Sequence, residues 1–340
     1  MPERRVAVNV SELSNPGWIW LGGRFSEDPF RWIGITGEPS SALEKKVQRP
    51  KLSAYRAAWQ TAWAAKRHDA ALIVSHGPRI SAWTSLFCRA LGVRATHLAF
   101  SFTFEELPTG TRRTLFTNAY RDIDRFVCFS SVECRRYSEY FDIPVDRIDS
   151  LHWAVAEAGY DSSAKPIEEP PYLCAVGGIG RDYRTLIDAM RLLPDRRLAI
   201  VARPANVEGI DLPSNVEVRT NIPLEDVWNI TANAKLMVLP ILDSLVPCGH
   251  GTLIMAMQLR VPSIVTQSTG MTDYVEDEVT GLVCPPADPE AMATCIERLW
   301  NDQALAERLI ANGRKFAIEE CSEERTVTYF TDYLKHLRLL

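Results

Sequence analysis

The chain has 340 residues, of which 46% are hydrophobic and 24% are charged. This composition is typical of a globular protein and excludes a disordered, collagenous or disulfide-stapled chain. The net charge of −5 is unevenly spread, since residues 1–165 carry +4 and the remainder carry −9. This asymmetry indicates two domains with unlike surfaces.

The sequence contains no apolar run near the roughly 18 residues that span a bilayer, and its first residues do not resemble a signal peptide. We therefore expect a cytoplasmic protein. The eight cysteines form no C-x-x-C pair and the six histidines have no metal-binding spacing, so we expect reduced thiols and no metal site. No interleaving of basic and aromatic residues typical of nucleic-acid binding is present, and we expect no nucleic-acid partner.

Short apolar runs alternate with helical segments along the first half, which predicts parallel α/β layers. The expected strands cover residues 5–10, 70–75, 96–102 and 125–130. A helix is expected over 52–66, with alanine and tryptophan on its inner face, and another over 80–91, ended by Gly92. These elements predict one doubly wound domain over residues 1–160.

Residues 161–171 are polar and rich in proline, which predicts a linker. Beyond it we expect strands at 172–176, 197–202, 216–219, 235–239 and 263–266, with helices at 182–193 and 252–259. These elements predict a second doubly wound domain over residues 172–324. The last residues have helical spacing at Val327, Phe330, Leu334 and Leu337, which predicts a terminal helix within 325–340.

The most informative segment follows the expected strand 235–239. A loop ending at Cys248 leads into Gly249-His250-Gly251-Thr252-Leu253 at a helix start. Backbone N–H groups and the positive end of the helix dipole at such a start favour an anion, with phosphate as the obvious ligand. A tight strand-to-helix connection explains the same pattern equally well.

A second glycine-bearing turn, Gly177-Gly178, precedes Arg181 and the expected N-cap Asp182. It is not the G-x-G-x-x-G motif of dinucleotide-binding folds. Arg181 follows a parallel strand, and a guanidinium at that edge can pair with a diphosphate. An ordinary surface charge is the alternative interpretation.

Taken in order, these segments resemble the donor half of GT-B glycosyltransferases of the family-4-like, or group 1, type. The resemblance covers residues 172 to about 300 and includes Gly177-Gly178, Arg181–Met190, Asn221–Glu225, Gly249–Met257, Val261–Thr266, Gly270, Tyr274–Asp277 and Thr280–Asp288. It implies an α/β fold of two Rossmann-like domains that face each other across a cleft, with the terminal helix 325–340 crossing back to the first. It further implies transfer of a sugar from a nucleoside-diphosphate sugar, such as a UDP-sugar, to an acceptor hydroxyl. The family works without a metal or cofactor and usually with retention of configuration.

The resemblance also assigns donor-binding residues. They are Gly178 and Arg181 beside the diphosphate, Asn221 and Ile222 beside the base, and Gly249, His250, Gly251, Thr252 and Leu253 at the phosphate. Two glutamates of the family pattern are replaced here by Pro247 and Met255, whose side chains cannot accept a hydrogen bond from a sugar hydroxyl. Asp243 is the nearest acid and the candidate catalytic replacement, although aspartate after a strand is also a common turn residue.

Acceptor-side candidates come from the first domain and the segment that follows it. His76 ends an apolar strand and is the candidate catalytic group, which would orient an acceptor hydroxyl or share its proton. The alternative is a histidine that is only hydrogen-bonded to its own loop. The remaining acceptor-binding candidates are Trp18, Trp20, Gly22, Gly23, Ser101 and His152. The tryptophans could stack on a sugar or plug an apolar gap.

The basic stretch 44–67 can rest on an anionic membrane surface or form a solvated helix face. The expected partners are thus a nucleotide sugar, an unidentified acceptor such as a glycan, lipid-linked glycan or small molecule, and peripherally a membrane. The replaced glutamates leave two alternatives to transfer. One is a silent homologue that binds a nucleotide or a partner protein, and the other is a sugar-nucleotide epimerase.

Overall fold

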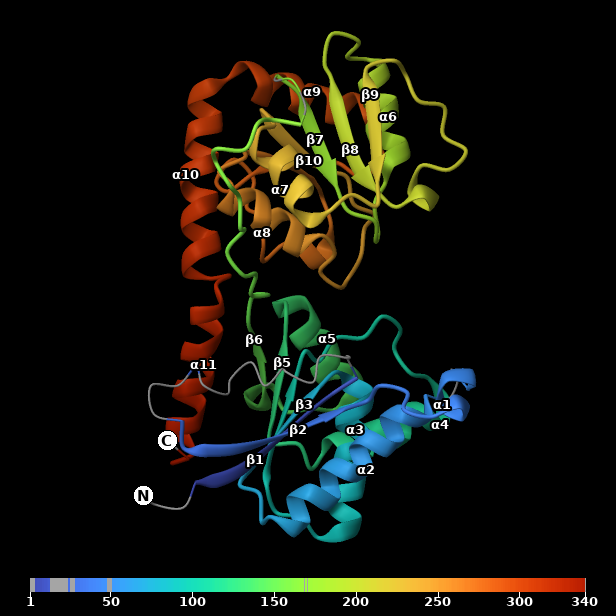
Figure 1. Ribbon diagram of the computed structural model, residues 1–340, viewed down its shortest axis with the longest axis vertical. Coiled ribbons are helices and arrows are strands. Elements are labelled where there is room, and N and C mark those ends of the chain that lie inside the picture. Colours follow the sequence, from blue (N-terminus) through green and yellow to red (C-terminus); the bar gives the residue numbers. More distant parts are fainter. Residues whose placement is uncertain are drawn as a thin grey trace. The chain divides into compact units, whose positions relative to one another are not determined.

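The structure is a computed structural model that describes residues 4–12, 24, 28–47, 51–167, 169 and 171–339. The chain forms two compact units, Met1–Leu151 with Val327–Leu340, and His152–Thr326 (Figure 1). Each unit contains a six-stranded, all-parallel sheet with flanking helices, which confirms the predicted α/β class with two doubly wound domains. The division between the units falls after Leu151, and the segment 161–171, predicted as the linker, lies inside the second unit.

The first sheet has the strand order β2-β1-β3-β4-β5-β6. Its strands are β1 (Arg5–Ser11), β2 (Phe30–Thr36), β3 (Leu72–His76), β4 (Thr96–Phe100), β5 (Arg125–Cys128) and β6 (Ile148–Ser150). The helices of this unit are α1 (Ala42–Lys46), α2 (Leu52–Arg67), α3 (Pro78–Leu91), α4 (Gly110–Tyr120) and α5 (Ser131–Phe141), with a 3₁₀ turn η1 (Val145–Arg147).

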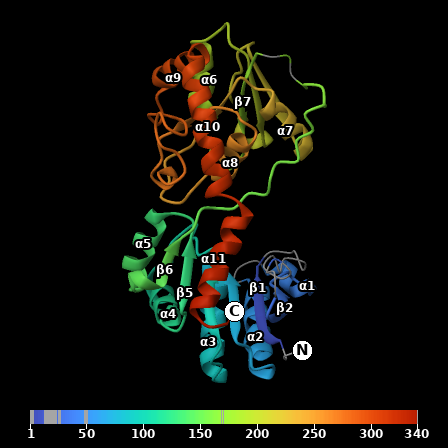
Figure 2. The same ribbon diagram turned by 90° about the vertical axis from the view of Figure 1, so that its left-hand side faces the viewer.

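Alternate strand residues of the first unit face opposite helices, as the pleat requires. Leu72 and Val74 of β3 pack with Phe330 and Leu334 of α11 (Glu323–His336). Ile73 between them packs in the cluster beneath α2 and α3. Figures 1 and 2 show α11 on one side of this sheet and α2 with α3 on the other. The end of the chain is therefore part of the core of its first half.

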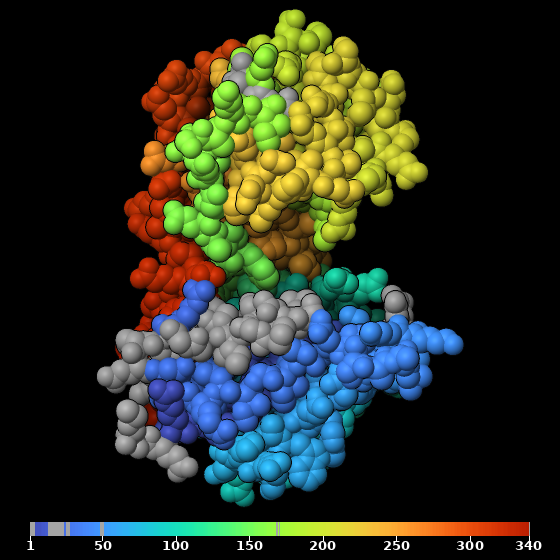
Figure 3. All heavy atoms as spheres, in the orientation of Figure 1, coloured from blue at the N-terminus to red at the C-terminus, as the bar shows by residue number. Residues whose placement is uncertain are grey.

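Helix α2 corrects one prediction. Its alanines face the core as expected, but Trp59 and Trp63 are 41% and 50% exposed. The prediction that both residue types lie on the inner face is wrong. The physical reason is that α2 packs closely against β1 and α3 through small side chains, which leaves the large indoles to the outside. Figure 3 shows the α2 segment in light blue on the near face of the first unit.

The second sheet has the strand order β12-β11-β10-β7-β8-β9. Its strands are β7 (Leu173–Val176), β8 (Leu198–Ala202), β9 (Val216–Thr220), β10 (Leu236–Leu239), β11 (Ser263–Thr266) and β12 (Leu282–Cys284). The helices are α6 (Tyr183–Arg191), α7 (Leu224–Ala232), α8 (His250–Gln258), α9 (Pro289–Asn301) and α10 (Gln303–Glu319), with 3₁₀ turns η2 (Pro204–Asn206) and η3 (Thr269–Met271). Figure 2 shows α6 and α9 on one side of β7 and α7 on the other. No helix in the described ranges is long and apolar enough to cross a membrane.

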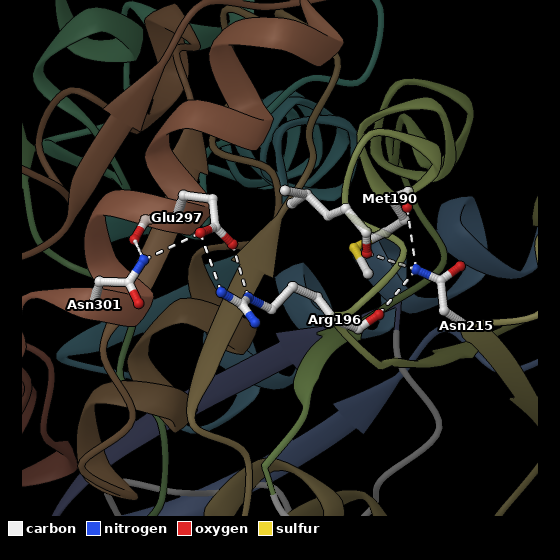
Figure 4. A network of polar contacts seen from close by, with 6 residues as sticks. Met190, Arg196, Asn215, Glu297 and Asn301 are labelled. Atoms are coloured by element: carbon white, nitrogen blue, oxygen red, sulfur yellow. Dashed lines mark hydrogen bonds and ion pairs between the residues drawn. The ribbon is translucent and has the colours of Figure 1, made fainter.

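A polar network ties the α6–β8 connection to α9 at the amino ends of the strands (Figure 4). The Asn215 side-chain amide donates to the carbonyls of Met190 and Arg196, at 3.1 and 2.9 Å. The Arg196 guanidinium in turn donates to both Glu297 carboxylate oxygens, at 2.7 and 3.1 Å. This network secures the edge of the sheet opposite to the carboxyl ends of the strands, which are the usual ligand edge.

Candidate functional site

Two loops meet at the centre of the second sheet. The order of the strands reverses between the neighbouring parallel strands β7 and β10, and the loops after them leave at the carboxyl ends, where open α/β sheets bind ligands. Three hydrogen bonds join these loops, from Leu242 N to Gly180 O (3.0 Å), Asp182 N to Pro240 O (2.9 Å) and Cys248 Sγ to Ile179 O (3.1 Å). The two glycine-bearing segments that the sequence singled out thus form one structure.

Arg181 lies between these loops. Its Nε donates to Val176 O at 3.1 Å and its Nη1 donates to Ile179 O at 2.9 Å. Its Nη2 donates to Thr252 Oγ1 in the first turn of α8, at 3.2 Å. The guanidinium is consequently fixed beside the start of α8, and its charge adds to the positive end of that helix.

Two glycines make room for this guanidinium. A Cβ on Gly249 would lie 3.0 Å from Arg181 Nη1, and one on Gly177 would lie 2.3 Å from Nη2. Both residues also have positive φ angles, +84° and +122°, which disfavour other residue types. The expectation that Gly249 admits a ligand therefore changes, because its space accommodates the arginine, whereas a Cβ on Gly251 would meet open space.

The first turn of α8 presents backbone amides next to Arg181. Gly249 is the N-cap, so His250, Gly251 and Thr252 are the first three helical residues, whose amides precede the intrahelical hydrogen-bond ladder. The amide of Leu253 already donates to Gly249 O at 2.9 Å, and its side chain is fully buried. The structure thus corrects the expectation that Leu253 offers an amide to phosphate, because the helix itself uses that amide.

The imidazole of His250 is packed rather than charged. Its ring lies 5.5 Å from that of Trp153 and 5.3 Å from that of Tyr274, between centroids. Burial, with a smaller contribution from the Arg181 charge, lowers the pKa of His250 to about 4. The neutral ring leaves Arg181 as the cation at this helix start. Trp153 and Tyr274 were not predicted site residues, although Trp153 directly follows the candidate His152 in the sequence.

The positions of the replaced glutamates offer no carboxylate. Met255 is 8% exposed and lies in the core cluster between α8 and the sheet. Asp243, the proposed substitute, accepts a hydrogen bond from Thr269 N at 2.9 Å, and this bond holds the pKa of its exposed carboxyl below the usual value. One Asp243 oxygen is thereby used to fasten η3 to the β10–α8 loop.

The remaining donor-side candidates lie in loops at the same edge of the sheet. Gly178 follows β7, and its carbonyl accepts from Asn206 Nδ2 at 2.6 Å. Asn221 follows β9, has a left-handed φ of +53° and is exposed. Ile222 next to it packs partly against the core cluster under α8. Within the described ranges, no three His, Cys, Asp or Glu residues gather as a metal-binding group.

His76 ends β3 in the first unit and is buried. Its Nε2 lies 2.7 Å from Asn9 Oδ1, and its ring lies edge-on to Phe100. Because Oδ1 only accepts, Nε2 carries the proton, and burial lowers the pKa of His76 to about 3. The neutral ring is therefore positioned by Asn9 and cannot take a proton at Nε2.

The other acceptor-side candidates do not all belong to one unit of the structure. His152 belongs to the second unit, where its Nε2 donates to Asp273 O at 2.9 Å and its ring packs on Tyr274 and Phe316. Ser101 follows β4 with a left-handed φ of +54° and is partly exposed. Trp18, Trp20, Gly22 and Gly23 lie outside the described residues.

Comparisons with known proteins agree with this architecture. Residues 161–316 match the family model described as Glycosyl transferases group 1. A segment is 44% identical over 68 residues to the capsular polysaccharide biosynthesis glycosyltransferase CapM of Staphylococcus aureus. That alignment covers 20% of this chain and spans 18% of the length of CapM.

Solved structures resemble nearly the whole chain. A glycosyltransferase from Rickettsia africae has a TM-score of 0.75 at 15% identity, over 98% of both chains. Anabaena Alr3699/HepE in complex with UDP has a TM-score of 0.71 at 12% identity, over 97% of this chain and 99% of that one. These likenesses identify the fold as GT-B, as predicted.

Proposed function

Because the chain has the GT-B fold and residues 161–316 match the group 1 glycosyl transferases, we propose that it transfers a sugar from a nucleoside-diphosphate sugar to an acceptor hydroxyl, without a metal and with retention. The observation that carries the proposal is the Arg181 guanidinium, hydrogen-bonded to Thr252 at the start of α8. A fixed cation beside the amides of a helix start is suited to an anionic group.

The same geometry suits the chemistry of transfer. When the bond between the sugar and the diphosphate breaks, negative charge grows on the departing phosphate oxygens. Arg181 and the amides of His250, Gly251 and Thr252 would hold that charge without reorganising, since the loop hydrogen bonds already fix them. Positive charge for the leaving group is thus supplied by this chain's own residues.

UDP is the first nucleotide to test, because the HepE neighbour was solved with UDP. We expect UDP to bind more tightly than UMP in isothermal titration calorimetry, since the second phosphate reaches the guanidinium. Arg181→Ala should weaken UDP binding about 10- to 100-fold, because hydrogen bonds to charged groups contribute about 1.5–3 kcal/mol. Arg184→Ala, an exposed arginine on α6, is the matched control and should bind as the wild type does.

Arg181 also supports its own loop, so Thr252→Val serves as a gentler second variant and should weaken binding by a few-fold. Equal UDP affinity of Arg181→Ala and wild type, or no binding of UDP, GDP or ADP by the wild type, would refute the proposed site. Retention is tested separately, by NMR of the anomeric configuration of the product.

A silent homologue is the second candidate, favoured by Pro247 and Met255 at the positions of the family glutamates. Release of UDP from UDP-sugars, alone and with acceptors, distinguishes it from the transferase. Binding with no release of UDP and no transfer indicates the silent homologue, whereas interconversion of free sugar nucleotides indicates an epimerase.

A further inference from the structure

Helix α2 buries its small residues and exposes its large ones. Its buried residues are Ser53, Ala54, Ala57, Ala58, Thr61, Ala62 and Ala65. Trp59 and Trp63, one turn apart, lie on the opposite side and are 41% and 50% exposed. An amphipathic helix that only completes a core has its large apolar residues turned inward. The two indoles therefore need an explanation other than the packing of this unit.

The exposed indoles contact each other and a neighbouring helix. Their ring centroids lie 6.0 Å apart in an edge-to-face arrangement, and Trp59 also contacts the Phe87 ring of α3 at 5.2 Å. Edge-to-face aromatic pairs are favourable beyond the area they bury. The pair thus forms a fixed apolar ridge on the surface of the first unit.

Positive charge continues this ridge. Lys66 and Arg67 occupy the last turn of α2, at three and four residues from Trp63, and are exposed. Among the described residues neither has a carboxylate within 4 Å, whereas Arg56 of the same helix is paired with Glu44 at 2.9 Å. Residues 45–68 contain seven Lys or Arg residues and no Asp or Glu. The outside of α2 therefore combines aromatic and unpaired cationic groups and no acid.

We propose that the α2 outer face, defined as Trp59, Trp63, Lys66 and Arg67, docks on the surface of an anionic lipid bilayer. Indole side chains favour the boundary between headgroups and acyl chains. Lysine and arginine next to it are attracted by anionic lipids, and the two contributions together give reversible attachment. We choose an anionic bilayer because of charge complementarity. A neutral or cationic surface would contact the indoles favourably but would not attract Lys66 and Arg67.

The direct test is flotation of the full chain with phosphatidylcholine vesicles, with and without phosphatidylglycerol. Binding should require phosphatidylglycerol and should weaken as salt rises from about 0.1 M to about 1 M, over which the screening length falls from ~10 to ~3 Å. Lys66→Gln with Arg67→Gln should lower the partition coefficient about 30-fold, since each cation near an anionic leaflet is worth about 1 kcal/mol. Trp63→Ser should lower the partition coefficient at least about fivefold, because the exposed half of the Trp63 side chain is no longer available to transfer from water into the bilayer.

The control is Leu192→Ser with Lys315→Gln, an exposed leucine and an exposed lysine of the second unit. This variant should bind vesicles as the wild type does. Thermal unfolding checks that the α2 variants fold, and the salt and lipid dependence of the wild type needs no variant.

Three results would overturn the proposal: no binding to phosphatidylglycerol vesicles, equal binding to neutral vesicles, or α2 variants that bind like the wild type. Sedimentation identifies the rival occupant. A wild-type dimer that Trp63→Ser dissociates, without vesicle binding, would assign the face to a second copy. The assay uses no nucleotide, so a negative result would not count against the proposed donor site in the second unit.

Discussion

Replacing Phe330 with alanine should destabilise the first unit, although residue 330 lies ten positions from the end of the chain. The ring is fully buried, in the same core cluster as Leu72 and Val74 of β3. It also contacts the Phe100 ring of β4, at 5.3 Å between centroids. The substitution removes this ring from the interior and leaves a cavity between α11 and the sheet.

Loss of a buried phenylalanine ring costs about 3–5 kcal/mol. A domain has a total free energy of unfolding of about 5–15 kcal/mol, so a large share of the stability of this unit is at risk. For a unit of this size, each 1 kcal/mol lowers the Tm by about 2–4 °C. We expect the transition of the first unit to fall by about 6–20 °C.

Differential scanning calorimetry of the full chain measures this change. Ile318→Ala on α10 is the matched control, because Ile318 is 51% exposed, and it should lower the free energy of unfolding by less than about 0.5 kcal/mol. A loss below about 1 kcal/mol for Phe330→Ala would refute the assignment of α11 to the first core.

Three further outcomes follow from the second unit. Glu297→Gln should lower the free energy of unfolding by up to about 1 kcal/mol at pH 7. The hydrogen bond from Arg196 lowers the pKa of Glu297 below its ordinary value of 4.5. The stability difference between wild type and variant should therefore persist above pH 4.5 and disappear as the pH falls through the lowered pKa. An equal stability difference at low pH in denaturant titrations would contradict this. Iodoacetamide should label Cys248 more slowly when UDP is present, as followed by mass spectrometry, and labelling that UDP does not slow would argue against the donor site. Gly249→Ala should lower the free energy of unfolding by about 1–2 kcal/mol, because alanine is disfavoured at the left-handed φ of this position. It should also weaken UDP binding, because its Cβ would lie 3.0 Å from Arg181 Nη1 and crowd the guanidinium; unchanged calorimetric affinity would count against that steric argument.

Much of the second sheet could be predicted because its central strands are short, mostly apolar runs between turn residues. The strand predicted at 263–266 is β11 itself, and the apolar run before Gly177 is β7. Strand β2 was not predicted, since Phe30–Thr36 includes an arginine and a glycine and lies at the edge of its sheet, where burial is partial. An edge strand lacks the continuous apolar pattern of a central one.

The candidate site was predictable at the level of loops and not at the level of contacts. Two glycine-bearing turns after parallel strands already indicated one anion site, because the carboxyl ends of parallel strands share an edge. The hydrogen bond between Arg181 and Thr252, and the use of Gly249 to accommodate that arginine, depend on which strands are neighbours. Sequence periodicity contains no such information. The exposure of Trp63 was missed for a related reason, since a helical pattern does not reveal how closely the helix approaches its sheet.

The return of the last fourteen residues to the first unit has a consequence for synthesis. As the nascent chain leaves the ribosome, strands β1 to β6 emerge early, while α11 emerges much later. The whole second unit, His152–Thr326, is made in between, which takes roughly 10–35 s at about 5–20 residues per second. During that interval the side of the first sheet that packs on α11 lacks this helix, so its apolar residues are open to contact with other chains or with a chaperone.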